Sequence, residues 1–256
     1  MSKFQFSVCP HDTAKNSTAW FFLNTYLQRN LGLGMHFEPK DNFIKEREDV
    51  ITGGYQLVYA NPFSAIVFCK QVGFLPIAKP IGISDEAVLV KYAGAVLPND
   101  QKIRVASATD KLIIHGLGLG VLSELGFDHK QCEFDFVGTH VKAAHAVIQG
   151  KADIGIVFNE TWNGMAESSR STLEVLGETN SKQASHCFCI SSEWADKKNQ
   201  IQEILCGMST DDKGIRILED LQFNAGFEPI DMADLDAAIK VMQKIPSSSG
   251  FLSSLV

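Results

Sequence analysis

The sequence of 256 residues has no long apolar run and no excess of positive charge. A helix that crosses a bilayer needs roughly 20 consecutive apolar residues, and no stretch of this chain approaches that length. The formal net charge is −7, which offers no electrostatic basis for binding nucleic acid. The first residues lack the charged region, apolar stretch and cleavage site of a signal peptide. We therefore expect no membrane span and no nucleic-acid partner.

Common catalytic and cofactor motifs are missing as well. The chain has no Gly-x-Ser-x-Gly, no His-Glu-x-x-His and no P-loop. The run Gly116-Leu-Gly-Leu-Gly120 lacks the spacing of a dinucleotide site, and we interpret it as small residues that let a helix approach a sheet. Asp110, His140 and Glu160 could form an acid–base group, but nothing in their spacing requires it. We expect no cofactor.

The six cysteines show no metal-binding pattern. No Cys-x-x-Cys occurs, and Cys187 and Cys189 would be neighbours on one face of a strand. His140 and His145 do not form a helical metal pair, because five residues turn a helix by roughly 500°. Cysteine is among the most buried residue types, so we expect buried free thiols, which fits a reducing compartment better than an oxidising one. We predict no metal site.

What the sequence does contain is a repeated alternation of strand and helix patterns. The stretch from Phe134 to Glu160 has the pattern of strand, polar turn, short helix ended by Gly150, strand and polar turn. The segment 41–62 repeats this arrangement, with a helix that stops at Gly53 before an apolar strand. Short strands that alternate with helices predict parallel α/β sheets. Two copies of the arrangement predict two related lobes.

The patterns assign most of the chain to elements. Strands are expected at residues 3–9, 35–39, 57–60, 86–90, 103–107, 134–137, 154–158, 173–176 and 185–190. Helices are expected at residues 17–31 after a loop at 10–13, then at 41–52, from 62 to Gly73, at 112–125, from 140 to Gly150, and at 195–208, 211–223 and 232–245. Residues 168–174 are expected to be largely surface loop. The predicted fold is α/β, with two Rossmann-like lobes, residues 1–88 plus 190–256 and residues 89–189, joined by two hinge crossings around a ligand cleft.

Polar residues follow several predicted strands at their carboxyl ends. Open α/β sheets bind ligands just outside these ends, so the residues found there are candidates for a ligand site. His11 and Asp12 follow the first strand, while Asn159 and Glu160 follow the strand at 154–158. His140 opens a helix and could donate a hydrogen bond to a ligand, with a structural or capping role as the alternative. We expect His115 to be packed inside the protein.

The order of these motifs resembles the phosphate/phosphonate-binding family of ABC-transport substrate-binding proteins, within the type 2 periplasmic binding-protein superfamily. The resemblance covers about residues 3–245. It is carried by four segments: Gly53-x-x-Gln-Leu-Val-Tyr59-Ala-Asn61-Pro62, Phe136-Val-Gly-Thr-His140, Gly150-Lys-Ala-Asp153-Ile-Gly-Ile-Val-Phe-Asn159-Glu160, and Gly226-Phe-Glu-Pro. It implies a ligand held between two lobes that close by a hinge motion. It also implies that Tyr59, Asn61 and His140 contact the ligand.

One turn departs from the family pattern. The family carries Ser-Thr-Ser-Gly at the start of the second lobe's first helix, where hydroxyls and amides hold phosphonate oxygens. This chain has Ser107-Ala-Thr109-Asp110-Lys111 in that region. Thr109 and Lys111 are the remaining ligand candidates there, and helix amides could still hold an anion. Asp110 would repel a phosphate unless Lys111 compensates its charge.

These observations predict a non-catalytic, monomeric binding protein for a small polar or anionic ligand, serving an ABC permease or a sensor protein. The alternative is a cytosolic enzyme on the same scaffold, resembling the menaquinone-pathway dehydratase and cyclase, that traps a carboxylate substrate. A periplasmic location requires that a signal peptide was removed from the chain; otherwise the protein is cytoplasmic.

Overall fold

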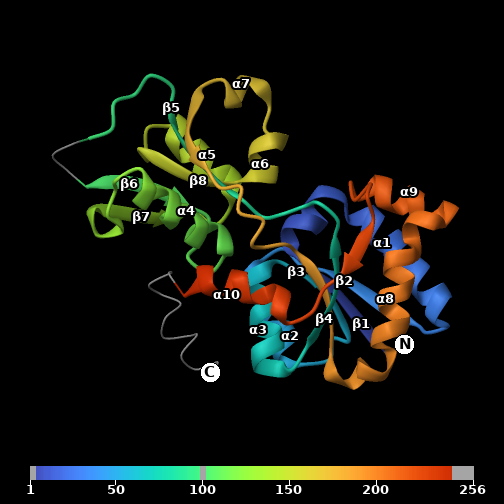
Figure 1. The fold of residues 1–256 in the computed structure, drawn as a ribbon. Helices are drawn as coiled ribbons and strands as arrows, with labels where there is room; N and C mark the ends of the chain where they lie inside the picture. The colour runs from blue at the N-terminus through green and yellow to red at the C-terminus, as the bar shows by residue number, and fades with distance from the viewer. Residues whose placement is uncertain (1–3, 99–101, 244–256) are drawn as a thin grey trace. The chain divides into compact units, whose positions relative to one another are not determined.

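The computed structural model describes residues 4–98 and 102–243 (Figure 1). The chain divides into two compact units: unit 1 contains Met1–Ile83 and Ser185–Asp236, and unit 2 contains Ser84–Ala184 and the segment from Ala237 onward. The backbone N–H of Asp85 donates to the carbonyl of Ala184 at 2.8 Å, so the two crossings run side by side. The lobe boundaries expected at residues 88 and 190 lie five residues from those of the units, at 83 and 185. The segment from Ala237 onward, expected in the first lobe, belongs to unit 2.

Unit 1 is built on a six-stranded sheet with the order β11-β4-β10-β3-β1-β2. Strands β1, β2 and β3 are parallel, whereas β10 runs antiparallel to both of its neighbours, β3 and β4. The strands are β1 Phe4–Val8, β2 Met35–Pro39, β3 Leu57–Ala60, β4 Leu75–Pro80, β10 Cys187–Ile190 and β11 Phe227–Pro229.

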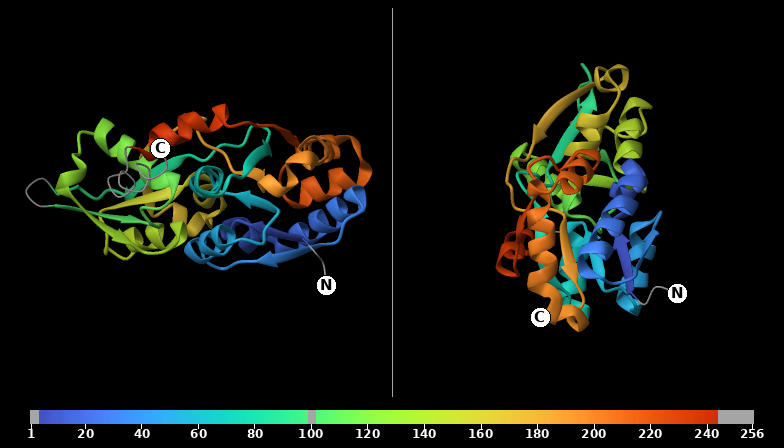
Figure 2. Two further views of the ribbon diagram at one scale, coloured as in Figure 1. Left: turned by 90° about the horizontal axis from the view of Figure 1, so that it is seen from below. Right: turned by 90° about the vertical axis from the view of Figure 1, so that its right-hand side faces the viewer.

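Helices contact both faces of this sheet (Figures 1 and 2). Helix α1 contacts β1 and β2 and packs against α8 and α9, while α3 contacts β3, β4 and β10 and packs against α2. The α-helices are α1 Pro10–Leu31, α2 Phe43–Thr52, α3 Pro62–Val72, α8 Lys198–Cys206 and α9 Asp212–Asp220, with 3-10 turns at Ser192–Lys197, Gly207–Thr210 and Ala233–Leu235. Helix α10, Asp236–Met242, begins at the last residue of unit 1, and its remaining residues belong to unit 2.

Unit 2 is built on a five-stranded sheet with the order β7-β6-β8-β5-β9, in which β5 runs antiparallel to β8 and β9. Its strands are β5 Ala87–Tyr92, β6 Ile103–Ser107, β7 Cys132–Phe136, β8 Ile154–Phe158 and β9 Leu173–Glu178. Its helices are α4 Ile113–Glu124, α5 His140–Ile148, α6 Asn159–Gly164 and α7 Glu167–Arg170, with a 3-10 turn at His129–Gln131. Among the described residues, no helix is long and apolar enough to cross a membrane.

The two sheets have the same topology. Read as β2-β1-β3-β10-β4 in unit 1 and β7-β6-β8-β5-β9 in unit 2, each has three parallel strands, one reversed strand and one more forward strand. The reversed strand comes from a crossing segment in both cases, β10 after the second crossing and β5 after the first. The predicted α/β fold with two related halves is confirmed.

The beginning of α1 differs from the prediction. Residues 10–13, expected as a loop, form the first turn of the helix, with Pro10 at a position where its missing N–H costs nothing. The helix is interrupted at Asn16, whose φ of −155° and ψ of 77° are not helical. The Asn16 side chain accepts from the N–H of Ala19 at 3.1 Å and so caps the helix that the sequence predicted from residue 17.

Other differences involve short elements. The proline-containing segment after α3 includes strand β4, and residues 168–170, expected as loop, belong to the short helix α7. The strand expected at residues 173–176 is present as β9. Strand β11 was not predicted, because three residues carry too little periodicity to recognise. The last predicted helix is shorter than expected in the described chain, and residues 244–245 of that prediction lie outside the described residues.

The glycine-rich helix α4 approaches the sheet of unit 2 closely at one glycine. A Cβ on Gly118 would lie 2.6 Å from Cγ2 and 2.9 Å from Cδ1 of Ile156, a buried residue of β8. A Cβ on Gly120 would meet no atom within 4 Å. The interpretation of this run as a packing feature is therefore confirmed at Gly118.

We predict that Gly118→Ala lowers the free energy of unfolding by about 1–3 kcal/mol, because the added methyl group overpacks the contact with Ile156. The matched variant Gly120→Ala should be neutral or stabilising by up to about 1 kcal/mol, since alanine is the better helix former. Denaturant unfolding of both variants measures the difference. Equal effects of the two substitutions would contradict the packing account.

Candidate functional site

The carboxyl edge of the unit 1 sheet is lined by the ends of β1 and β3. The N–H of Cys9, just after β1, donates to the carbonyl of Tyr59 in β3 at 2.7 Å, which holds the two strand ends together. Helices α1 and α3 begin directly afterwards, at Pro10 and Pro62. Strand order reverses between β1 and β3, and open α/β sheets bind ligands at such a point.

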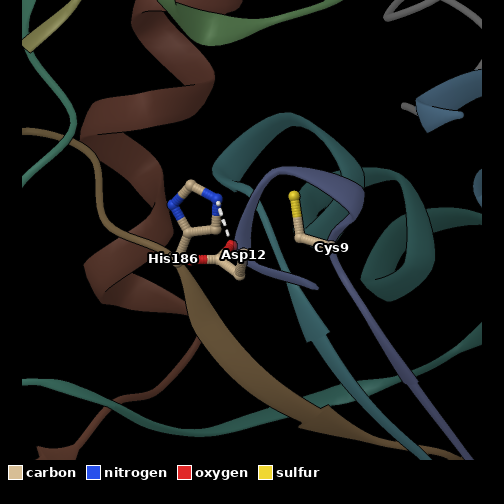
Figure 3. A group of neighbouring side chains, drawn as sticks. All are labelled: Cys9, Asp12 and His186. Atoms are coloured by element: carbon tan, nitrogen blue, oxygen red, sulfur yellow. Dashed lines mark ion pairs between the residues drawn. The ribbon is translucent and has the colours of Figure 1, made fainter. Parts of the chain in front are cut away.

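Strand β10 brings a further residue to this edge. Cys187 at its start pairs with Ala60 at the end of β3, so His186 lies just outside the edge. One side-chain atom each of Cys9, Asp12 and His186 lie within 4.8 Å of one another (Figure 3). The closest ionic contact among them is 3.4 Å, between Nε2 of His186 and Oδ2 of Asp12.

The three side chains are almost completely buried. Cys9 is 0% exposed, Asp12 is 7% exposed and the His186 side chain is 10% exposed. The ring of Tyr59 stacks on that of His186 with centroids 5.7 Å apart, and its other neighbours are core aromatic residues such as Trp20. Burial raises the pKa of the Cys9 thiol, and a hydrogen bond with His186 opposes this shift.

A second layer of polar groups lies behind this edge. Asn61 caps α3 by accepting from the N–H of Ser64 at 3.0 Å, and its Nδ2 lies 3.7 Å from Sγ of Cys9. Arg47 donates to Oγ of Ser64 at 3.1 Å. Burial raises the pKa of Glu46 to about 7, against the opposing charge of Arg47. The predicted ligand residue Asn61 thus links the strand edge to a buried charged layer.

The carboxyl edge of the unit 2 sheet collects the loops after β6, β7 and β8. The N–H groups of Val137 and Gly138 donate to the carbonyls of Ser107 and Ala108, both at 2.9 Å, and so join the first two loops. Oγ1 of Thr109 accepts from the N–H of Lys111 at 3.2 Å. Helix α4 then begins without a side-chain cap. The N–H of His115 in its first turn donates to the carbonyl of Leu112 at 3.2 Å, and the N–H groups of this turn form the positive end of the helix dipole.

His140 is the first residue of α5 and is buried. Thr139 caps the helix by accepting from the N–H of Lys142 at 3.2 Å. The imidazole ring lies 5.8 Å from the ring of Phe158 at the end of β8, measured between centroids. The structure therefore brings His140 next to the end of β8, where helix α6 begins with Asn159 and Glu160.

Asn159 is engaged within unit 2. Its Oδ1 accepts from the N–H of Glu86 at 3.2 Å and its Nδ2 donates to the carbonyl of Ser84 at 3.1 Å. Glu86 itself accepts from the N–H of Lys182 at 2.6 Å. Burial opposes ionisation of Glu86, but hydrogen bonds from Thr179, Lys182 and Ser181 hold its pKa below the ordinary value.

The predicted site residues thus fall into two groups, one in each unit. His11, Asp12, Tyr59 and Asn61 lie at the carboxyl edge of unit 1, and Thr109, Lys111, His140, Asn159 and Glu160 lie at that of unit 2. His186 and Glu86 also lie at these edges and were not among the predicted site residues. Each residue stands just before a reversed strand, Glu86 before β5 and His186 before β10. The strand predicted at residues 185–190 could have indicated His186, because the beginning of a reversed strand lies at the carboxyl edge of its parallel neighbours.

His115 occupies the interior of unit 2, as predicted. Its Nδ1 lies 3.2 Å from Oγ of Ser107, and the rings of Phe134 and Phe136 meet its ring edge-on at 5.1 and 5.4 Å. Burial lowers the pKa of His115 to about 4, and the charge of Asp110 opposes this shift. The imidazole is therefore neutral at physiological pH.

The shared strand order of the two sheets gives this chain the fold of the type 2 periplasmic binding proteins. The family model for the phosphonate periplasmic substrate-binding protein of ABC transporters matches residues 6–235, and the chain belongs to this family. Substrate-binding proteins of ABC transporters bind small ligands and act with a permease, without catalysis. The predicted solute-binding function is confirmed at this level, and the enzyme alternative receives no support.

Solved structures share the fold at low sequence identity. PhnD1 from Prochlorococcus marinus, in complex with methylphosphonate, has a TM-score of 0.74 and 14% identity, with 94% of this chain and 97% of that chain covered. XAC2383 from Xanthomonas citri, bound to chloride ion, has a TM-score of 0.76 and 12% identity over 97% and 99% of the two chains. The aliphatic sulphonate binding protein SsuA from Escherichia coli has a TM-score of 0.67 and 12% identity over 99% and 88%. No curated protein matches the sequence.

We predict that acidification from pH 6.5 towards pH 4 destabilises unit 2 through His115, by an amount on the order of 2–3 kcal/mol. In this window the unfolded chain binds a proton at this histidine and the folded chain does not, so stability present above pH 6.5 is lost as the pH falls. His115→Gln should remove this part of the pH dependence in denaturant unfolding. The exposed His145→Gln is the control, and an unchanged slope in the His115 variant would refute the assignment.

Proposed function

We propose that the protein binds a small oxyanion of the phosphonate or sulfonate class for ABC-type uptake. The observation that carries this proposal is the arrangement at the carboxyl edge of unit 2, in a chain of the phosphonate-binding family. There α4 begins without a side-chain cap just after the turn that carries the Thr109 hydroxyl and the exposed Lys111, and the loop before His140 is hydrogen-bonded to this turn. Backbone N–H groups at a helix start and a lysine favour a bound anion.

Lys111 and Asp110 set the charge balance of this edge. Lys111 is exposed and supplies a positive charge, whereas Asp110, in contact with the Thr109 hydroxyl at 3.4 Å, supplies a negative one. The repulsion from Asp110 acts twice as strongly on a dianion as on a monoanion at the same distance. The attraction of Lys111 doubles in the same way, so Asp110 reduces the preference for a dianion that Lys111 and the helix start would otherwise produce.

The location, the oligomeric state and the permease partner are inferred from the properties of the family. We expect the protein to work in the periplasm, as a monomer, and to deliver its ligand to a permease. His11, Asp12, Tyr59 and Asn61 remain predicted ligand residues of unit 1. Asn159, whose amide bonds to Glu86 and Ser84, would position the start of helix α6 and Glu160 rather than donate to the ligand itself.

We predict that Lys111→Gln weakens binding of methylphosphonate or methanesulfonate about 10-fold, because a hydrogen bond to a charged group contributes about 1.5 kcal/mol or more. Asp110→Asn should strengthen binding, more for methylphosphonate than for methanesulfonate at a pH where the phosphonate is a dianion. Isothermal titration calorimetry measures both effects, and Lys142→Gln on α5 is the exposed lysine control.

A first screen by thermal shift should include phosphate, phosphonates, sulfonates and carboxylates. A ligand at 100 times its dissociation constant stabilises the native state by about 2.7 kcal/mol. No shift with any oxyanion would overturn the proposed function. A ligand that binds equally well to the Lys111→Gln, Lys142→Gln and native proteins would instead overturn the assigned site.

A further inference from the structure

We infer that Cys9, Asp12 and His186 form a binding site for a transition-metal ion of the Zn²⁺ type. A thiol sulfur, a carboxylate oxygen and an imidazole nitrogen lie within 4.8 Å of one another in unit 1. They come from the end of β1, the first turn of α1 and the residue before β10. The site thus forms within one compact unit, and it is independent of the proposed oxyanion site in unit 2.

The side chains converge on one point instead of forming a relay. In Figure 3 the His186 nitrogen that faces Asp12 also lies on the side of Cys9, while the other ring nitrogen points away. A catalytic Cys-His-Asp group needs the thiol and the carboxylate on different nitrogens of the ring. Three donors directed at the same space are the arrangement that a metal ion requires.

The distances need only small adjustment for metal binding. Zinc bonds of about 2.0 Å to nitrogen and 2.3 Å to sulfur place tetrahedral donor atoms about 3.3–3.6 Å apart. The separation between His186 and Asp12 is already 3.4 Å. The other separations are at most 4.8 Å and can shorten through rotation of the Cys9 and Asp12 side chains. Three protein ligands leave the fourth position of a tetrahedral ion open.

The surrounding charges also suit a divalent cation. With Cys9 as thiolate and Asp12 ionised, the site carries two buried negative charges, and buried charges require compensation. The nearby Glu46 and Arg47 carry opposite charges and are themselves buried, so together they add little net charge when both are ionised. The amide of Asn61, 3.7 Å from Sγ of Cys9, supplies an outer-shell contact to the sulfur.

No sequence pattern indicates this site, because its residues are separated by up to 177 positions (from 9 to 186) and follow no spacing motif. The antiparallel pairing of β10 with β3 brings them together.

The test is titration of reduced, metal-free protein with Co²⁺, followed by competition with Zn²⁺. We expect one equivalent of Co²⁺ to produce a sulfur-to-cobalt charge-transfer band and the visible bands of a tetrahedral ion, and Zn²⁺ to abolish both. Cys9→Ser should lose the charge-transfer band, and His186→Gln should weaken binding at least 10-fold. Cys206→Ser and the exposed His36→Gln are matched controls and should behave like the native protein.

A measurement on the native protein keeps the inference testable if the buried variants fail to fold. X-ray absorption of the zinc-loaded protein should show one sulfur and two or more nitrogen or oxygen ligands. Absence of bound metal after dialysis, a ligand set without sulfur, or a cobalt spectrum lost in the Cys206 variant instead of the Cys9 variant would each overturn the assignment. None of these outcomes bears on oxyanion binding at unit 2.

Discussion

In each unit one strand runs against its neighbours, and this reversal determines which residues reach the carboxyl edge of the sheet. Strand β10 in unit 1 and β5 in unit 2 both follow a crossing between the units. A reversed strand begins where its parallel neighbours end, so the residue before it is placed among their polar loops. His186 therefore lies beside Cys9 and Asp12, and Glu86 beside Asn159. The crossings therefore connect the two units and also place His186 and Glu86 at the carboxyl edges of the sheets.

The same constraint explains why ionisable groups are buried at both edges. Asp12 and Glu86 are each almost inaccessible, and an unpaired charge at such a position would be costly. Glu86 is stabilised by N–H and hydroxyl donors of the second crossing, including Lys182 and Ser181. The carboxylate of Asp12 lies 3.4 Å from the imidazole of His186. Each edge thus depends on contacts that form only when the reversed strand is in place.

Sequence patterns predicted the parts of the fold that depend on local chemistry. Strand β8 was predicted to the residue, because its apolar run lies between the glycine stop at Gly150 and the polar Asn159. The start of α1 was missed, since a proline at a first helical turn also suits a loop. His186 was interpreted only as part of a core strand. Its neighbours at the sheet edge are set by the pairing of β10 with β3, which no local sequence pattern encodes.

We propose that a small oxyanion binds at the carboxyl edge of the unit 2 sheet. Amide chemical shifts of ¹⁵N-labelled protein, followed during titration with methylphosphonate and methanesulfonate, test it directly. We expect the largest shifts at residues 109–113, 138–140 and 159–160, and no shifts on the outer faces of α4 and α5. Saturable shifts confined to other regions, or no shifts with either anion, would contradict it.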